Sequence, residues 1–264
     1  MSAALTYASY LRLDDILTAQ TPRSGQNGEF EHDEMLFIII HQVYELWFKE
    51  ILHEIDHLKD LLHANDTSRA LHTFRRLLTI LKTVVGQIDV LETMTPLEFN
   101  SFRGFLATAS GFQSIQFREL EFVLGHKRRN VLNHFPEGMF GREKLEARYE
   151  QPTLWDAFLC FLHNNGYPIP QEQLTRDVTQ SIEPSEAVQA VLVSVYRQNP
   201  VIARICERMV DMDEGLQEWR YRHVQMVART IGSKPGTGGS SGVQYLRTTL
   251  SPAFPDLWAI RKDL

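Results

Sequence analysis

The stretch HDEMLFIIIHQVYELWFKE at residues 32–50 decides the fold. Its apolar residues recur at intervals of three and four, which is the period of an α-helix with one buried face. The pattern continues beyond residue 50 and predicts one long helix over about 34–63. Four side chains share one face of this helix: Phe37, His41, Tyr44 and Phe48. A histidine is therefore embedded among aromatic rings.

The same spacing runs along most of the chain, while glycine and proline gather at a few breaks. Asn199 and Gly232 bound the last long helix. Residues 126–151 are charged and interrupted, and they predict mainly loop. The other expected helices cover about 5–18, 67–94, 96–106, 112–124, 153–164, 184–198 and 200–231, with a short one ending at Leu250. The chain is thus predicted to be all-α, a single large helical-bundle domain over 1–264 with long central helices.

Composition argues against several classes of protein. Lys and Arg number 27 against 33 Asp and Glu, so the net charge of −6 gives no support for nucleic-acid binding. The longest apolar run, residues 35–40, is far shorter than the roughly 20 residues that cross a bilayer, so no membrane span is expected. Cys160 and Cys206 lack CxxC partners, which disfavours both a disulfide framework and a zinc knuckle. We therefore expect a cytoplasmic location.

A second histidine lies in the predicted helix 200–231, where Trp219, His223 and Met226 follow one apolar stripe. An imidazole in apolar surroundings stays neutral, and a neutral imidazole is the donor that a haem iron binds. A histidine packed into a core gives the same pattern. For both His41 and His223, spacing alone leaves the two interpretations open.

The first long helix also contains Glu-x-x-His twice, at residues 50–53 and 54–57. This spacing occurs in carboxylate-bridged di-iron bundles, which need a second such pair on a facing helix and two further glutamates. The other instance in the chain, residues 29–32, falls in a predicted loop. A solvated, charged helix face is the favoured interpretation.

Two further features could serve a ligand. Phe99 and Arg103 lie one turn apart, so a ring and a guanidinium project together and suit an amphipathic amino acid, although an ordinary surface arginine gives the same pattern. Ser110 and Gly111 open the next helix, whose N–H groups could bind an anion.

The glycine-rich run GTGGSSG at residues 236–242 lacks the Lys-Ser/Thr pair and the preceding strand of a phosphate-binding loop. It fits either a mobile linker or a lid that closes over a ligand, with Thr237 supplying a hydroxyl.

Taken together, six segments resemble the tryptophan 2,3-dioxygenase family in order and spacing, over nearly the whole chain. They are LTYASYL (5–11), HDEMLFIIIHQVYELWFKE (32–50), FNSFR (99–103), SGFQSIQFR (110–118), WRYRHVQMV (219–227) and GTGGSSGVQYL (236–246). The resemblance implies a pocket for haem b, one per subunit and ferrous in the active form. It also implies a homotetramer with shared active sites and a lid at 233–242.

The resemblance further assigns roles to individual residues. His223 would be the axial ligand of the haem iron, His41 the distal residue that meets the indole N–H, and Arg103 the partner of the substrate carboxylate. Ser110 and Gly111 would lie against the haem. The other substrate-binding positions would be Phe37, Ile38, Ile39, Ile40, Phe99 and Thr237 and, from the N-terminal segment (1–20) of a neighbouring subunit, Tyr7, Tyr10 and Leu11.

The activity implied is insertion of both atoms of O2 across the indole C2–C3 bond of L-tryptophan. The product would be N-formyl-L-kynurenine, in the first step of tryptophan catabolism by the kynurenine pathway. Residues 126–199 receive no role from the resemblance. Three other classes of protein are alternatives to this function: a di-iron or other non-haem oxygenase, a haem-binding sensor without turnover, and a helical scaffold protein without a cofactor.

Overall fold

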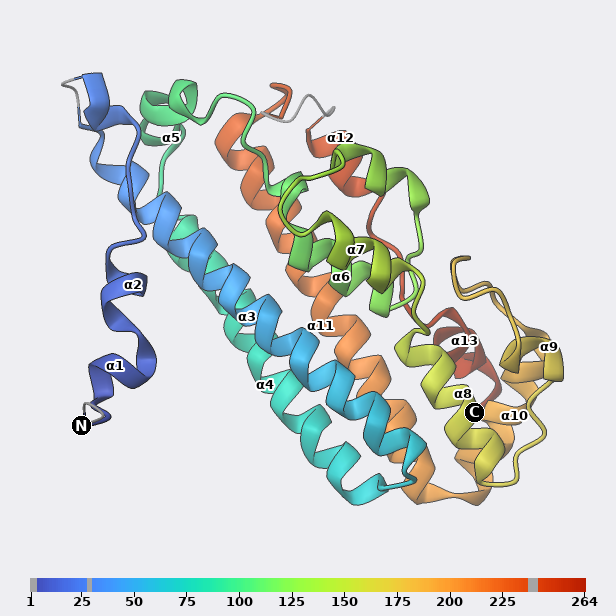
Figure 1. The fold of residues 1–264 in the computed structure, drawn as a ribbon. Helices are drawn as coiled ribbons and strands as arrows, with labels where there is room; N and C mark the ends of the chain where they lie inside the picture. The colour runs from blue at the N-terminus through green and yellow to red at the C-terminus, as the bar shows by residue number, and fades with distance from the viewer. Residues whose placement is uncertain (1–3, 28–29, 237–241) are drawn as a thin grey trace.

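The computed structural model describes residues 4–27, 30–236 and 242–264, and every regular element in these ranges is a helix (Figure 1). This confirms the all-α prediction. The longest helices are α3 (His32–His63), α4 (Thr67–Leu91) and α11 (Pro200–Ile231). The shorter α-helices are α1 (Tyr7–Leu11), α2 (Leu13–Leu17), α5 (Pro96–Arg103), α6 (Ile115–Val123), α7 (Arg142–Tyr149), α8 (Leu154–Asn164), α9 (Gln171–Leu174), α10 (Glu186–Gln198), α12 (Val243–Arg247) and α13 (Pro255–Ala259). The 3₁₀ turns are η1 (Ser24–Asn27), η2 (Gly104–Leu106), η3 (Gly111–Gln113), η4 (Arg129–His134) and η5 (Ile260–Asp263).

The three long helices lie side by side and form the centre of the bundle (Figure 1). Helix α4 begins where Asp66 accepts a hydrogen bond from the Arg69 N–H, and α11 begins where Asn199 accepts from two backbone N–H groups, with Pro200 at its first position. These start signals confirm the predicted helix starts. The helix predicted over 67–94 ends three residues earlier than expected, because α4 ends at Leu91.

One main hydrophobic core extends from the long helices to α8, α10 and α13. Among the largest fully buried side chains are Phe74, Trp155, Phe158, Phe161 and Phe254. Burial of this apolar area is the main force that holds the layers together. In the described part of the chain, no helix combines the length and the apolar character needed to cross a membrane.

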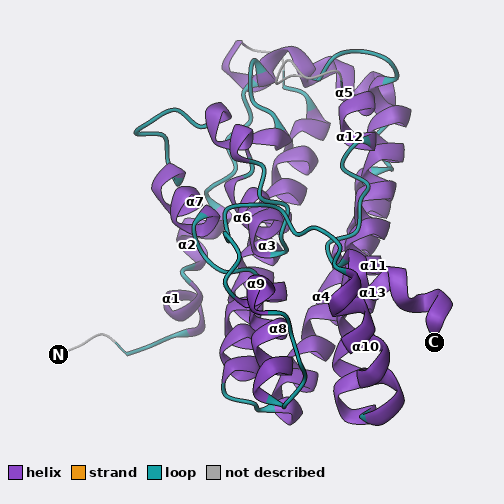
Figure 2. Ribbon diagram, turned by 90° about the vertical axis from the view of Figure 1, so that its right-hand side faces the viewer, coloured by secondary structure: helices purple, strands orange, loops and turns teal. Residues whose placement is uncertain are grey.

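The N-terminal segment differs from the single helix predicted over about 5–18. Arg12 takes a left-handed conformation with φ of 53°, which ends α1 and separates it from α2. Both helices lie to one side of the bundle (Figure 2). On α1, Tyr7 and Tyr10 are 77% and 72% exposed, so these aromatic side chains are not packed into the hydrophobic core of this chain.

Three other predicted ranges also need correction. The α-helix predicted over 96–106 ends at Arg103 and continues as a 3₁₀ turn, and the one predicted over 112–124 begins as η3, with α6 starting after the Ser114 cap. The range 126–151, predicted as loop, contains η4 and α7. Helices α9 and α13 were not predicted at all.

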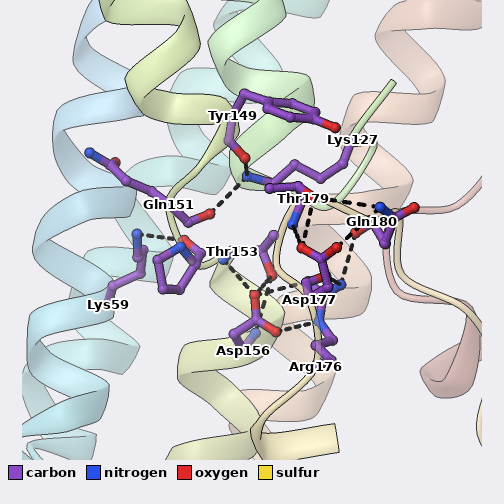
Figure 3. A network of polar contacts seen from close by, with 11 residues as sticks. Lys59, Lys127, Tyr149, Gln151, Thr153, Asp156, Arg176, Asp177, Thr179 and Gln180 are labelled. Carbon is purple, nitrogen blue, oxygen red and sulfur yellow. Dashed lines mark hydrogen bonds and ion pairs between the residues drawn. The ribbon is translucent and has the colours of Figure 1, made fainter. Parts of the chain in front are cut away.

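Part of the order in the 126–151 range comes from Lys127, which is buried (Figure 3). Its ammonium donates hydrogen bonds to the backbone carbonyls of Arg148, Tyr149 and Gln151, at 3.0, 2.6 and 2.8 Å. A cation at the end of a helix satisfies carbonyls that have no partner within the helix. Lys127 thereby fixes the C-terminal end of α7 beside the start of α8.

The C-terminal segment is held by Asp213, a buried residue of α11. Its carboxylate accepts hydrogen bonds from the backbone N–H groups of Ala253 and Phe254 and from Nε1 of Trp258, the last at 2.8 Å. These contacts seat Phe254 and α13 against the main core.

Candidate active site

A cavity of about 270 Å³ lies where one end of the long helices meets α5, α6 and α12. Its walls are largely apolar, and polar groups enter it at a few points. Seven of the residues singled out from sequence line it: Phe37, His41, Phe99, Arg103, Ser110, Gly111 and His223. They come from α3, α5, the turn before α6, and α11, so the fold brings together segments that are far apart in the chain.

His41 enters the cavity from α3, and its tautomer follows from one hydrogen bond. Its Nδ1 lies 2.6 Å from the Phe37 carbonyl oxygen. Because a carbonyl only accepts, Nδ1 carries the proton and Nε2 keeps its lone pair. Burial lowers the pKa of His41, although the bond to Phe37 and the charge of Glu45 oppose the shift. His41 is therefore a neutral imidazole with a free acceptor nitrogen.

His223 enters from α11 and stacks on Trp219, with ring centroids 5.2 Å apart and an interplanar angle of 12°. It forms no hydrogen bond with any residue that the structure describes. Burial, assisted by His41 and the positive charge of Arg118, lowers its pKa to about 4. A neutral imidazole without a partner in an apolar cavity is suited to donate its lone pair to a metal.

One end of the cavity is walled by aromatic rings. The Phe37 ring lies 4.1 Å from the His41 ring, 5.9 Å from Phe99 and 5.4 Å from Phe102, measured between centroids. Phe99 and Phe102 project from α5, whose start is fixed by a capping box between Thr95 and the residue three positions later. A flat apolar group can pack against these rings.

Arg103 lies at the end of α5, at the edge of the same cavity. Its Nη2 donates a hydrogen bond to the Pro235 carbonyl oxygen at 2.6 Å. The guanidinium thus joins α5 to the start of the predicted lid at 233–242. Thr237, predicted to bind substrate, lies outside the described residues, as does the rest of 237–241.

Ser110 and Gly111 line the cavity next to η3. The Ser110 hydroxyl accepts the N–H of Phe112 at 3.3 Å, so this turn already satisfies one of its own donors. The prediction that Ser110 and Gly111 lie against a haem is compatible with their position.

The remaining predicted residues are not brought to this cavity. Ile38, Ile39 and Ile40 follow Phe37 on α3, but none of them lines the cavity. Ile39 is 42% exposed, and Ile40 belongs to the main core. Tyr7, Tyr10 and Leu11 are exposed on α1 and do not line it either. Their roles in binding substrate stay predictions.

A buried charged cluster in the cavity wall was missed from sequence. Arg118 and Glu121 of α6 line the cavity together with Arg220 of α11. Arg118 and Glu121 are 2.5 Å apart, and Arg220 lies 3.0 Å from the same carboxylate. The only sequence signal was a glutamate between the apolar residues Leu120 and Phe122.

Comparison with known proteins identifies the family. The family model described as tryptophan 2,3-dioxygenase matches residues 1–147 and 171–264. The chain belongs to the tryptophan 2,3-dioxygenase family. A tryptophan 2,3-dioxygenase of Herpetosiphon aurantiacus is 65% identical over the full length of both chains. Proteins of that name from Anaeromyxobacter sp. (strain K) and Caulobacter vibrioides are 56% and 42% identical; each alignment spans this whole chain and 97% and 100% of the relative.

The tryptophan 2,3-dioxygenase family is haem-dependent, and the cavity fits such a group. The fit rests on His223, a half-buried and neutral nitrogen donor that has no hydrogen-bond partner among the described residues and lines a largely apolar cavity. The di-iron alternative finds no such support. Glu54 is buried against Arg76 at 2.5 Å, and the described ranges contain no group of three or more His, Cys, Asp or Glu that could hold a metal ion.

Proposed function

We propose that the protein is a haem-dependent dioxygenase that inserts both atoms of O2 across the indole C2–C3 bond of L-tryptophan. The product is N-formyl-L-kynurenine, and the reaction is the first step of tryptophan catabolism by the kynurenine pathway. One observation carries the proposal: two neutral histidines from different long helices line the same cavity, and a guanidinium lies at its edge. Family membership supports it.

In this proposal the imidazole of His223 would hold haem b, one per subunit and ferrous in the active form. The bound haem supplies the binding and activation of O2. The protein supplies orientation and a dry surrounding, which together remove much of the entropic barrier of a reaction between two molecules.

Substrate orientation follows from the chain's own groups. The indole N–H donates to the free Nε2 of His41, the rings of Phe37 and Phe99 pack on the indole, and Arg103 binds the carboxylate. His41 acts as an acceptor that positions the indole and not as an obligatory base, because an indole N–H is a very weak acid. Thr237 would bind the end of the substrate that carries the ammonium and carboxylate groups.

The assembly belongs to the same proposal. The exposed Tyr7, Tyr10 and Leu11 have no partner in this chain's own core, which supports their role in the pocket of a neighbouring subunit of a homotetramer. The cytoplasmic location stays a prediction, supported by two free cysteines, one of them buried.

One experiment separates this function from its rivals. The purified protein should show a Soret band, and its ferrous form should convert L-tryptophan in the presence of O2 to a product with the absorbance of N-formyl-L-kynurenine. A missing Soret band would favour a scaffold without a cofactor, and a Soret band without turnover would identify a sensor.

Replacing Arg103 by alanine should lower kcat/KM for L-tryptophan roughly ten- to a hundredfold, because a charge-assisted pair contributes about 1.5–3 kcal/mol. The measurement is steady-state kinetics with L-tryptophan and with tryptamine, which lacks the carboxylate. The loss should be much smaller for tryptamine. Arg129→Ala, which lies outside the cavity, is the control. Normal efficiency of Arg103→Ala with L-tryptophan would refute the carboxylate assignment.

Replacing His41 by alanine should lower kcat/KM roughly two- to tenfold, the effect of one neutral hydrogen bond worth about 0.5–1.5 kcal/mol. Haem content and helix content should not change. The matching substrate is 1-methyltryptophan, which has no N–H to donate, so the variant should discriminate less between the two indoles than the unaltered enzyme does. Equal discrimination by both proteins would show that His41 does not bind the N–H.

A further inference from the structure

The cavity wall between α6 and α11 contains an imbalance of charge. Glu121 is 1% exposed, and its carboxylate accepts hydrogen bonds from three guanidiniums. Arg118 lies 2.5 Å away, Arg128 2.8 Å and Arg220 3.0 Å. Three positive charges therefore share one negative charge in this cluster.

The position and exposure of the three arginines show where the excess positive charge lies. Arg118 and Arg220 line the cavity and are 6% and 4% exposed, whereas Arg128 does not line it and is 33% exposed. Water can therefore stabilise Arg128, but it cannot fully stabilise the other two.

The remaining polar contacts do not neutralise the two buried arginines. Arg118 donates from Nε to the Phe112 carbonyl and lies over that ring, and Arg220 donates to the Thr249 carbonyl. These partners are uncharged. The Nε of Arg220 is buried and has no hydrogen-bond partner among the described residues.

An unpaired buried charge is destabilising, so the excess positive charge at Arg118 and Arg220 would be stabilised by anionic groups inside the cavity. Although burial alone would raise the pKa of Glu121, the three guanidiniums lower it, and its own negative charge is already shared among them. Among the described residues, no carboxylate other than that of Glu121 pairs directly with Arg118 or Arg220, and the buried Asp213 acts on Arg220 only from a longer distance. An anionic occupant of the cavity would complete the pairing, and one with two negative charges would balance the three guanidiniums together with Glu121.

The proposed cofactor has that chemistry, since haem b carries two carboxylates on one edge of the porphyrin. Arg220 precedes His223 by three residues on α11, and both side chains line the cavity. The single carboxylate of the substrate is assigned to Arg103 on α5. The start of η3, where Ser110 already accepts the Phe112 N–H, offers no comparable charge.

We propose that Arg118 and Arg220 bind the two carboxylates of the haem, and that Glu121 holds both guanidiniums in position. This inference rests on the proposed function, because it takes haem as the occupant. Glu121 also acts as an internal counter-ion, which limits repulsion among the three arginines before the cofactor enters.

The test compares ferric protoporphyrin IX with its dimethyl ester, in which both carboxylates are neutral. Full-length apoprotein is titrated with each porphyrin in the same detergent-containing buffer, and binding is followed by the Soret band. The unaltered protein should bind the diacid at least about tenfold more tightly, since hydrogen bonds between charged groups are the strong ones. Arg118→Met and Arg220→Met should each lower this preference severalfold, and Arg118→Lys should retain part of it.

Arg128→Met is the matched control, because Arg128 contacts the same carboxylate from outside the cavity, and its diacid preference should be unchanged. Binding of the dimethyl ester reports that a variant keeps its folded pocket. Equal affinity of the unaltered protein for both porphyrins, or an unchanged preference in both methionine variants, would overturn the inference and leave the proposed function standing. Failure to bind either porphyrin would overturn both.

Discussion

His223→Ala should purify with little or no haem, and its affinity for ferric protoporphyrin IX should fall about a hundredfold or more. Loss of a residue that only supports a metal ligand already costs about 10–100-fold in affinity, and loss of the ligand itself should cost at least as much. The variant should keep its helix content, because His223 forms no hydrogen bond with the described residues that its removal would break. The readouts are the Soret absorbance per polypeptide and far-UV circular dichroism.

Added imidazole offers a sharper form of this experiment. The alanine variant leaves a space beside Trp219, where free imidazole can bind and serve as the missing ligand. Haem binding should then recover in part, with an imidazole-like spectrum. His53→Ala, an exposed histidine on α3, is the control and should retain full haem content. A complete Soret band with unaltered ligation in His223→Ala would refute the assignment.

Asp213→Ala should lower the free energy of unfolding by about 3–5 kcal/mol, because three donors lose a charged acceptor and each unsatisfied buried donor costs about 1–3 kcal/mol. Asp213 is 2% exposed and accepts from two backbone N–H groups and the Trp258 indole. Without the carboxylate, the two buried backbone N–H groups and the half-buried indole N–H lose their acceptor. Urea denaturation followed by circular dichroism measures the change.

The control for this variant is Asp211→Ala, two residues earlier on the same helix. Asp211 pairs at 3.0 Å with Arg208 on the surface, and exposed pairs contribute only about 0–1 kcal/mol. A loss of stability in Asp213→Ala no larger than in Asp211→Ala would show that the C-terminal segment is held by its apolar contacts alone.

The sequence predicted the long helices well because their signals are local. A buried stripe with a period near 3.6 runs the length of α3 and α11, and Asn199 and Pro200 mark the start of α11. Helical spacing predicted that Phe37 and His41 share one helix face and that Phe99 and Arg103 share another. Their meeting in one cavity depended on packing between α3, α5 and α11, which no local pattern encodes.

The errors lie where tertiary contacts override local patterns. Lys127 and Arg128 form part of a basic run that is typical of a surface. Lys127 is nevertheless buried and donates to three backbone carbonyls, of which Figure 3 shows those of Tyr149 and Gln151, and Arg128 pairs with Glu121. The break between α1 and α2 occurs at Arg12, which has a positive φ although it is not glycine, so the sequence gives no signal for it. The charged cluster could not be predicted from local spacing, because Glu121 and Arg220 are 99 positions apart in the sequence. Function itself was predicted from family resemblance, since spacing left both histidines open.

The aromatic end of the cavity has its own small hydrophobic cluster. Met94, Phe99 and Phe102 form its buried part, and it is separate from the main core that contains α8 and α10. Regions with few buried contacts open locally at a lower free energy than the whole molecule. Backbone amides of α5 should therefore exchange with deuterium faster than those at the centre of α11. Such opening would let a large planar ligand enter or leave while the rest of the bundle remains folded.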